Sequence, residues 1–299
     1  MGEHSVVYGQ PAIALPLPDV KLVVTIKEAK AGQIVQSRYS DCDWQALPET
    51  MHGIQKLIAT LVKRFNGQDD YWRLSIDSQL PAERGMGSSA ATAIAIVRAF
   101  FNYYGQPLDR PTLLKLADVE EQITHRSPSG LDAATTSSKV PLYFIKGQEG
   151  TPIPLNLQAT MVIADTGIKG ATKEAILAVQ KLLQTAPAMA QSHIKHLGKL
   201  VQATRQFLAN NEVIKLGTAL TAAQHDLQAL QVSNHQLDHL IKVANNNGAL
   251  GAKLTGGGRG GCMFAITATA LGARKLATIL KENGAHQTWI QPLDSRGEE

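Results

Sequence analysis

The segment "RGMGSSAA", from Arg84 to Ala91, combines glycines and serines in a way that suits the binding of a phosphate group. Glycine lets a backbone turn tightly and approach a ligand, and the apolar run that follows predicts a helix whose first N–H groups would face an anion. Ser88 and Ser89 could cap this helix, or turn a hydroxyl toward a phosphate or its magnesium ion. The lysine of the Walker pattern is missing. A capped helix without any ligand is the alternative interpretation.

A second segment, "VEEQITHRSPSGLDAATTS", carries acidic residues that could serve phosphoryl transfer. Glu121 and His125 lie four residues apart, and therefore on one face of a predicted helix, while Asp132 follows a tight turn that would fix the direction of its carboxylate. One carboxylate could hold a metal ion and another could accept the proton of a hydroxyl. The alternative is a solvated surface helix followed by an aspartate that caps the next helix.

Two further segments bring glycines together with charged residues. In "KLTGGGRGGC", from Lys253 to Cys262, the glycines indicate that the backbone passes close to something, although a linker is the alternative. Arg259 within this run could reach a phosphate or point to solvent. The chain opens on "MGEHSVVYGQPAIALPLP", in which Glu3 and His4 are either solvated residues of a terminus or the start of a site.

The elements that must position these residues follow from periodicity. Residues 20–28 and 71–77 have the composition of strands, and the segment from Gly32 is expected to be the hairpin partner of the first. Further strands are expected over 140–145, from residue 160, up to residue 266 and over 286–293. Helical spacing is found in the first half of the chain over 49–65, from Ser88 to about Gly105 and from Pro111 to about His125. In the second half it is found over 171–183, 189–211, 213–230, 234–248 and 269–282.

The composition excludes several classes of protein. The 299 residues, 44% hydrophobic and 18% charged, suit a globular protein of two domains or two lobes. The net charge of +4 is scattered and aromatic residues are few, so we expect no nucleic-acid partner. Two cysteines, Cys42 and Cys262, make no disulfide framework, and no apolar stretch could span a membrane or serve as a signal, so we expect a cytoplasmic protein without a membrane partner. His193, His196, His225 and His239 are expected to be surface or packing residues.

Taken together, the glycine-rich segments and the acidic segment resemble the GHMP kinase family of galactokinases, homoserine kinases, mevalonate kinases and phosphomevalonate kinases. The resemblance covers nearly the whole chain. Within the family, "GEHSVVYGQPAIALPL" and "HRSPSGLD" are most similar to mevalonate kinases of bacteria. Arg126 stands where those enzymes usually have glycine, and Gly257 where many have alanine.

The resemblance implies a role for each matching position. Asp132 would be the catalytic residue, Ser89 and Glu121 would hold Mg²⁺, and ATP would be the phosphate donor. The loop around ATP would consist of Pro81, Ala82, Glu83, Arg84, Gly85, Met86, Gly87, Ser88, Ser89, Ala90 and Ala91. Mevalonate would contact Glu3, His4, Asp132, Thr255, Gly256, Gly257 and Gly258.

The implied fold is α+β, with an N-terminal ATP-binding domain over residues 1–167 and a ferredoxin-like C-terminal domain of antiparallel sheet and helices over residues 168–299. The implied activity is phosphorylation of the 5-hydroxyl of mevalonate for isoprenoid synthesis, and a homodimer is left open. Family members carry a lysine on a strand before the Gly-Glu-His, whereas Met1 directly precedes Gly2 here. We expect that the true start lies upstream. The alternatives are another small-molecule kinase of the family and a weakened, ligand-binding paralogue.

Overall fold

The computed structural model describes residues 1–124 and 130–293, and the chain forms two compact units. Unit 1 consists of Met1–Asp19, Glu83–Met86 and Val140–Glu299, and unit 2 of Val20–Ala82 and Gly87–Lys139. The predicted ATP loop is therefore divided between the units: Glu83–Met86 belongs to unit 1, whereas the residues before it and those from Gly87 onward belong to unit 2. The domain boundary expected between residues 167 and 168 stays a prediction.

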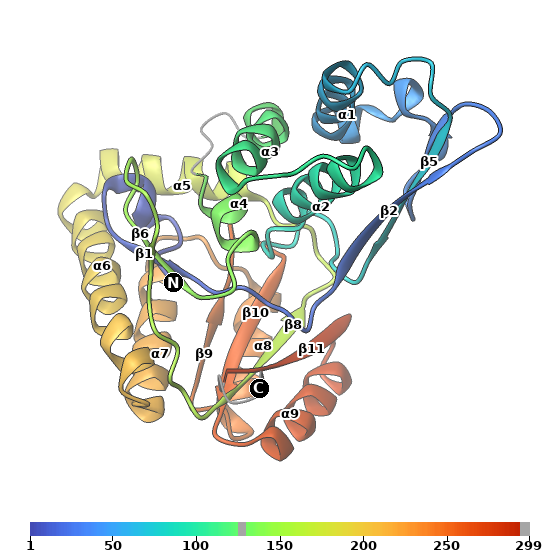
Figure 1. Cartoon of the computed structure of the whole chain (residues 1–299). Coiled ribbons are helices and arrows are strands. Elements are labelled where there is room, and N and C mark those ends of the chain that lie inside the picture. The colour runs from blue at the N-terminus through green and yellow to red at the C-terminus, as the bar shows by residue number, and fades with distance from the viewer. Residues whose placement is uncertain (125–129, 294–299) are drawn as a thin grey trace. The chain divides into compact units, whose positions relative to one another are not determined.

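Unit 2 combines one sheet with helices that bury a shared core (Figure 1). The helix α1 shows why this sequence folds so: Ile54, Leu57, Ile58 and Leu61 recur at helical spacing and are all buried. The core also includes Trp72 from the sheet and Phe100 from α2, whose rings meet edge to face at 5.5 Å. The elements of unit 2 are β2 (Leu22–Glu28), β3 (Gln33–Gln36), β4 (Asp41–Asp43), α1 (His52–Arg64), β5 (Trp72–Ser78), α2 (Ser88–Tyr103), α3 (Arg110–Thr124) and α4 (Leu131–Thr136).

The expected hairpin of β2 with the segment after Gly32 is wrong. The sheet has the order β2-β5-β3-β4, so β5 lies between the supposed partners, antiparallel to β2 and parallel to β3. The physical reason is burial, because β5 carries Trp72 and Leu74, which are both fully buried and gain most from the central position. The hairpin partner of β3 is instead β4.

The described residues of unit 1 form two sheets. One has the order β1-β6-β7, and the other the antiparallel order β11-β8-β10-β9. The elements β8, α8, β9, β10, α9 and β11 form a β-α-β-β-α-β arrangement of the ferredoxin-like kind, with α5, α6 and α7 inserted between β8 and α8 (Figure 1). The expected α+β class is confirmed. The elements of unit 1 are β1 (Ala12–Ala14), β6 (Leu142–Phe144), β7 (Thr151–Pro152), β8 (Thr160–Asp165), α5 (Thr172–Thr185), α6 (Pro187–Ala209), α7 (Val213–Ala229), α8 (His235–Asn246), β9 (Gly251–Leu254), β10 (Cys262–Thr267), α9 (Ala270–Glu282) and β11 (Gln287–Pro292).

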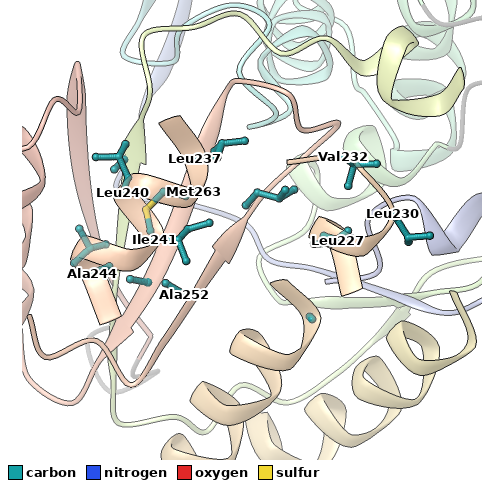
Figure 2. Close-up of a cluster of buried hydrophobic side chains, with 14 of the residues drawn as sticks. Leu227, Leu230, Val232, Leu237, Leu240, Ile241, Ala244, Ala252 and Met263 are labelled. Atoms are coloured by element: carbon teal, nitrogen blue, oxygen red, sulfur yellow. The ribbon is translucent and has the colours of Figure 1, made fainter. Parts of the chain in front are cut away.

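The main core of unit 1 lies where α8 packs on this sheet. Figure 2 shows Leu237, Leu240 and Ile241 of α8 beside Met263 and Ala252 of the strands. All five are buried, which fixes β9 and β10 beneath the helix. The glycine run after Lys253 links these two strands, so its ends are anchored by the core.

Most predicted helices and strands are present within one to three residues of the expected bounds. The short strands β1, β4, β7 and β9 were not predicted. Across residues 1–124 and 130–293, the helices are either too short or too polar to cross a membrane.

Candidate active site

The helix α2 begins at Ser88, directly after Gly87, which has a φ of 65°. Because the N-cap residue Gly87 has no side chain, the first N–H groups of α2 have no side-chain cap, so of the two possible roles of Ser88 and Ser89 the capping role is not found. Ser88 contributes its carbonyl to the hydroxyl of Thr92 instead. An uncapped N-terminus presents N–H donors and the positive end of the helix dipole, which is the arrangement that binds a phosphate.

The hydroxyl of Ser89 donates a hydrogen bond to Oε1 of Glu120 on α3. Glu120 is buried, and so is Glu121, whose Oε1 accepts a hydrogen bond of 3.2 Å from the N–H of Gly130. The direct partner of Ser89 is thus Glu120, whereas the sequence had pointed to the neighbouring Glu121. Hydroxyl and carboxylate oxygens are ligands that suit Mg²⁺, so this part of unit 2 fits the ion. The metal roles of Ser89 and Glu121 stay predictions.

Asp132 lies in the first turn of α4, after Gly130 with its φ of 71°. Its side chain is exposed, and Gly87 lies against it: a Cβ atom on Gly87 would be 3.7 Å from Cγ of Asp132. Unit 2 therefore brings the predicted catalytic carboxylate to the start of α2, where a phosphate is expected. His125, which was predicted to share a helix face with Glu121, lies outside the described residues.

In unit 1 two glycine-rich segments meet backbone to backbone. A Cβ atom on Gly256 would be 2.4 Å from Cα of Gly85, and one on Gly85 would be 2.7 Å from the carbonyl oxygen of Thr255. Both glycines have a φ of 75°. The expectation that the glycine run passes close to something is confirmed, and the partner is the first half of the predicted ATP loop.

Arg84 ties this half of the loop to β8. Its guanidinium lies 3.2 Å from a carboxylate oxygen of the buried Asp165 and donates to the carbonyl of Gly167 at 3.0 Å. Its carbonyl oxygen accepts a hydrogen bond of 3.0 Å from the N–H of Cys262. Arg84 thus anchors the loop within unit 1, and its predicted contact with ATP stays a prediction.

His4 is buried against the glycine run. Its Nε2 atom lies 2.9 Å from the carbonyl oxygen of Gly257. A carbonyl only accepts, so Nε2 carries the proton and Nδ1 of the neutral ring is an acceptor. Burial lowers the pKa of His4, which keeps the ring neutral near pH 7. The neighbouring Glu3 is mostly buried too, and the N-terminal residues therefore belong to the fold rather than to a frayed terminus.

The charged group nearest to Glu3 is Lys253, which the sequence interpretation missed. Lys253 is fully buried on β9, and its Nζ atom lies 2.5 Å from Oε1 of Glu3. Burial opposes the charge of Glu3, but nearby positive charge, chiefly that of Lys253, outweighs burial and lowers the pKa of Glu3 to about 2. Burial also lowers the pKa of Lys253, and the Glu3 carboxylate opposes that shift.

Other polar residues have structural partners. Arg259 donates through Nε to the carbonyl of Gln231 at 3.1 Å. His193 and His196 on α6 both bond the buried carboxylate of Asp226 on α7, at 2.8 and 2.7 Å. These contacts hold helices or loops together.

Both parts of a known family match the sequence. Residues 53–139 match the family described as the GHMP kinases N terminal domain, and residues 201–286 match the GHMP kinases C terminal. The chain is 30% identical to the mevalonate kinase of Pyrococcus horikoshii, over 95% of this chain and 89% of that protein.

Solved structures agree over almost the whole length. The mevalonate kinase from methicillin-resistant Staphylococcus aureus MRSA252 is 31% identical with a TM-score of 0.78, covering 99% of this chain and 95% of that one. The L. major mevalonate kinase in complex with R-mevalonate shares the fold at 24% identity, with a TM-score of 0.82 over 99% of this chain and 94% of that one. With both family domains matched, and a relative 30% identical over most of its length, the chain belongs to the GHMP kinase family.

Proposed function

We propose that this protein transfers the γ-phosphate of ATP to the 5-hydroxyl of mevalonate, forming 5-phosphomevalonate for isoprenoid biosynthesis. The family consists of ATP-dependent small-molecule kinases, and the relatives described above are mevalonate kinases. The observation that carries the chemistry is the carboxylate of Asp132 beside Gly87, at the start of α2.

Phosphoryl transfer depends mainly on positioning and on stabilising negative charge. The uncapped first turn of α2 would bind the phosphates of ATP through its N–H groups. The close backbone contact of Gly85 with Gly256 would support the first half of the ATP loop, which precedes α2.

Ser89, together with Glu120 or Glu121, would hold Mg²⁺. All three side chains offer oxygen ligands, and Ser89 and Glu120 already lie in hydrogen-bonding contact. When bound, the ion supplies positive charge that neutralises the phosphate oxygens. The protein contributes few ligands in this proposal, as is usual for Mg²⁺ bound with phosphates.

Asp132 would accept the proton of the 5-hydroxyl or orient that hydroxyl by hydrogen bonding. Its side chain is exposed, and it lies in the first turn of the short helix α4. On the substrate side, Nδ1 of the neutral His4 would accept a hydrogen bond from a hydroxyl group of mevalonate. The backbone of Thr255 to Gly258 would supply further contacts.

Purified protein should be assayed with ATP, Mg²⁺ and, in turn, mevalonate, phosphomevalonate, galactose and homoserine. We expect phosphorylation of mevalonate at a kcat/KM well above that for the other three alcohols. Preference for another acceptor would refute the substrate assignment, and nucleotide binding without turnover of any acceptor would refute the kinase assignment.

A further inference from the structure

Lys253 is an unusual residue of unit 1, because its side chain is fully buried. Lysine is almost never buried completely unless its charge is paired. The partner is Glu3, which lies 250 positions earlier in the chain and 2.5 Å from the ammonium. A buried pair of this kind gives little net stability, since both charges lose their hydration, so its presence calls for another explanation.

The ammonium of Lys253 also bonds the backbone just before the glycine run. It donates a hydrogen bond of 2.5 Å to the carbonyl of Leu254, the last residue of β9, and lies 5.2 Å from the centre of the Phe264 ring. Three residues further on, the carbonyl of Gly257 accepts the hydrogen bond from His4. The consecutive residues Glu3 and His4 therefore contact the two ends of the segment from Lys253 to Gly257.

The backbone of His4 needs such support. Its φ is 59° and its ψ is −38°, a conformation that residues with side chains rarely adopt. Glu3 is held on one side by Lys253, and its carbonyl accepts a hydrogen bond of 2.7 Å from the N–H of Ser5. The ion pair of Glu3 and the contact of the His4 ring with Gly257 thus lie on either side of this unusual backbone conformation.

We propose that Glu3 and Lys253 are positioning residues, whose buried ion pair holds the His4 ring on the carbonyl of Gly257 and so fixes the substrate side of the site. The inference rests on the proposed function in one respect, the assignment of His4 and the glycine run to mevalonate. In this proposal Glu3 acts through the adjacent His4: its Oε1 atom is paired with Lys253, and its buried Oε2 atom makes no hydrogen bond to any of the described residues. Neither residue is a catalytic residue.

The charges around Glu3 give the proposal a distinctive signature. Lys253 on β9 and the ring of His4 are the titratable side chains that face it. Without Lys253, burial would dominate and raise the pKa of Glu3, so that this carboxyl would take up a proton at a much higher pH. A residue that merely fills space would produce no new ionisation.

The variants are Lys253→Met, Glu3→Gln and the double variant, with Lys215→Met as the matched control. Lys215 also pairs with a glutamate, Glu212 at 3.0 Å, but that pair is on the surface. We expect at least a tenfold higher KM for mevalonate in each variant of the buried pair, with kcat within about threefold, and no change in the control. In Lys253→Met the KM should also vary with pH between 5 and 8, whereas it should not in the double variant.

A second measurement does not depend on activity. In protein labelled with ¹⁵N-histidine, the His4 ring, assigned with His4→Gln, should be a single Nε2–H tautomer in the wild type and a mixture in Glu3→Gln. An unchanged His4 signal together with an unchanged KM would overturn the proposal, as would equal losses of kcat, nucleotide binding and thermal stability. If Lys253→Met does not fold, Glu3→Gln and the double variant, in which neither residue of the pair is charged, still test whether the pair positions His4. If the wild type fails to phosphorylate mevalonate while the ring signal responds as expected, the proposed substrate is refuted and the positioning role stands.

Discussion

The hydroxyl of Ser89 on α2 is bonded to Oε1 of Glu120 on α3, whereas the adjacent Glu121 accepts a hydrogen bond from the N–H of Gly130. Neighbouring residues on a helix point about 100° apart, which is why these two consecutive carboxylates reach different partners. Both side chains are buried, so a substitution that removes either charge should change the contacts which that carboxylate makes.

Glu120→Gln is expected to raise the Mg²⁺ concentration needed for half-maximal activity. The substitution removes the negative charge of a group that either holds the ion or orients Ser89 toward it, and such changes typically cost about 10–100-fold in metal affinity. Titration of activity with Mg²⁺ at saturating ATP measures the effect, and Glu121→Gln is the comparison.

The Ser89–Glu120 contact predicts that Ser89→Ala and Glu120→Gln are not additive in a double-mutant cycle. If only Glu121→Gln changed the Mg²⁺ requirement, the contact of Ser89 with Glu120 would have no part in metal binding. Ser89 and Glu121, the ligands that the family resemblance implies, would then be supported.

Asp132→Asn should lower turnover far more than ATP affinity. The amide cannot take up a proton, and the loss of a general base typically costs on the order of 10²–10⁴ in rate. The side chain is exposed, so the fold should survive the isosteric change. Single-turnover phosphorylation and equilibrium binding of a nucleotide separate the two effects; equal losses in both would argue against the catalytic role.

Gly256→Ala should be strongly destabilising, and the contact with Gly85 gives the reason. The added Cβ would lie 2.4 Å from a backbone atom, which cannot swing aside as a side chain can. Gly248→Ala is the matched control, because Gly248 has a φ of 90° but open space around it. Urea unfolding should show a loss of about 1 kcal/mol for the control, from backbone strain alone, and about 3 kcal/mol or more for Gly256→Ala. Similar losses would mean that the close approach of the two loops has little energetic weight.

The sequence predicted what depends on local pattern. The apolar spacing of α1 and the β-branched run of β2 were sufficient to place these elements within a few residues. The pattern also indicated that Gly256 lies close to something, but the partner, Gly85, depends on a contact between segments 171 positions apart in the chain. No local pattern contains that information.

The errors have the same origin. The strand β9 has four residues, Gly-Ala-Lys-Leu, with neither alternation nor β-branched side chains, so it gave no signal, and Lys253 was missed with it. The pairing of β3 was wrong because burial of Trp72 and Leu74 placed β5 in the middle of the sheet. Glu120 was missed because the rotation of α3 about its axis, which decides which glutamate meets Ser89, is set by packing in the core.

The Glu3–Lys253 pair should make stability fall in acid. In the folded protein the pKa of Glu3 is about 2, against an ordinary value of 4.5, so the ionised carboxylate stabilises the fold above pH 4.5 and this contribution is lost as the pH falls through 2. The difference amounts to roughly 3 kcal/mol.

Urea unfolding of the wild type and Glu3→Gln at pH 7 and at intervals below pH 5 should show the advantage of the wild type in unfolding free energy shrinking by about that much. Glu212→Gln, which breaks only the exposed pair with Lys215, should show a much smaller change. A constant difference between wild type and Glu3→Gln across this range would mean that Glu3 titrates alike in the folded and unfolded chains, and the buried ion pair would be contradicted.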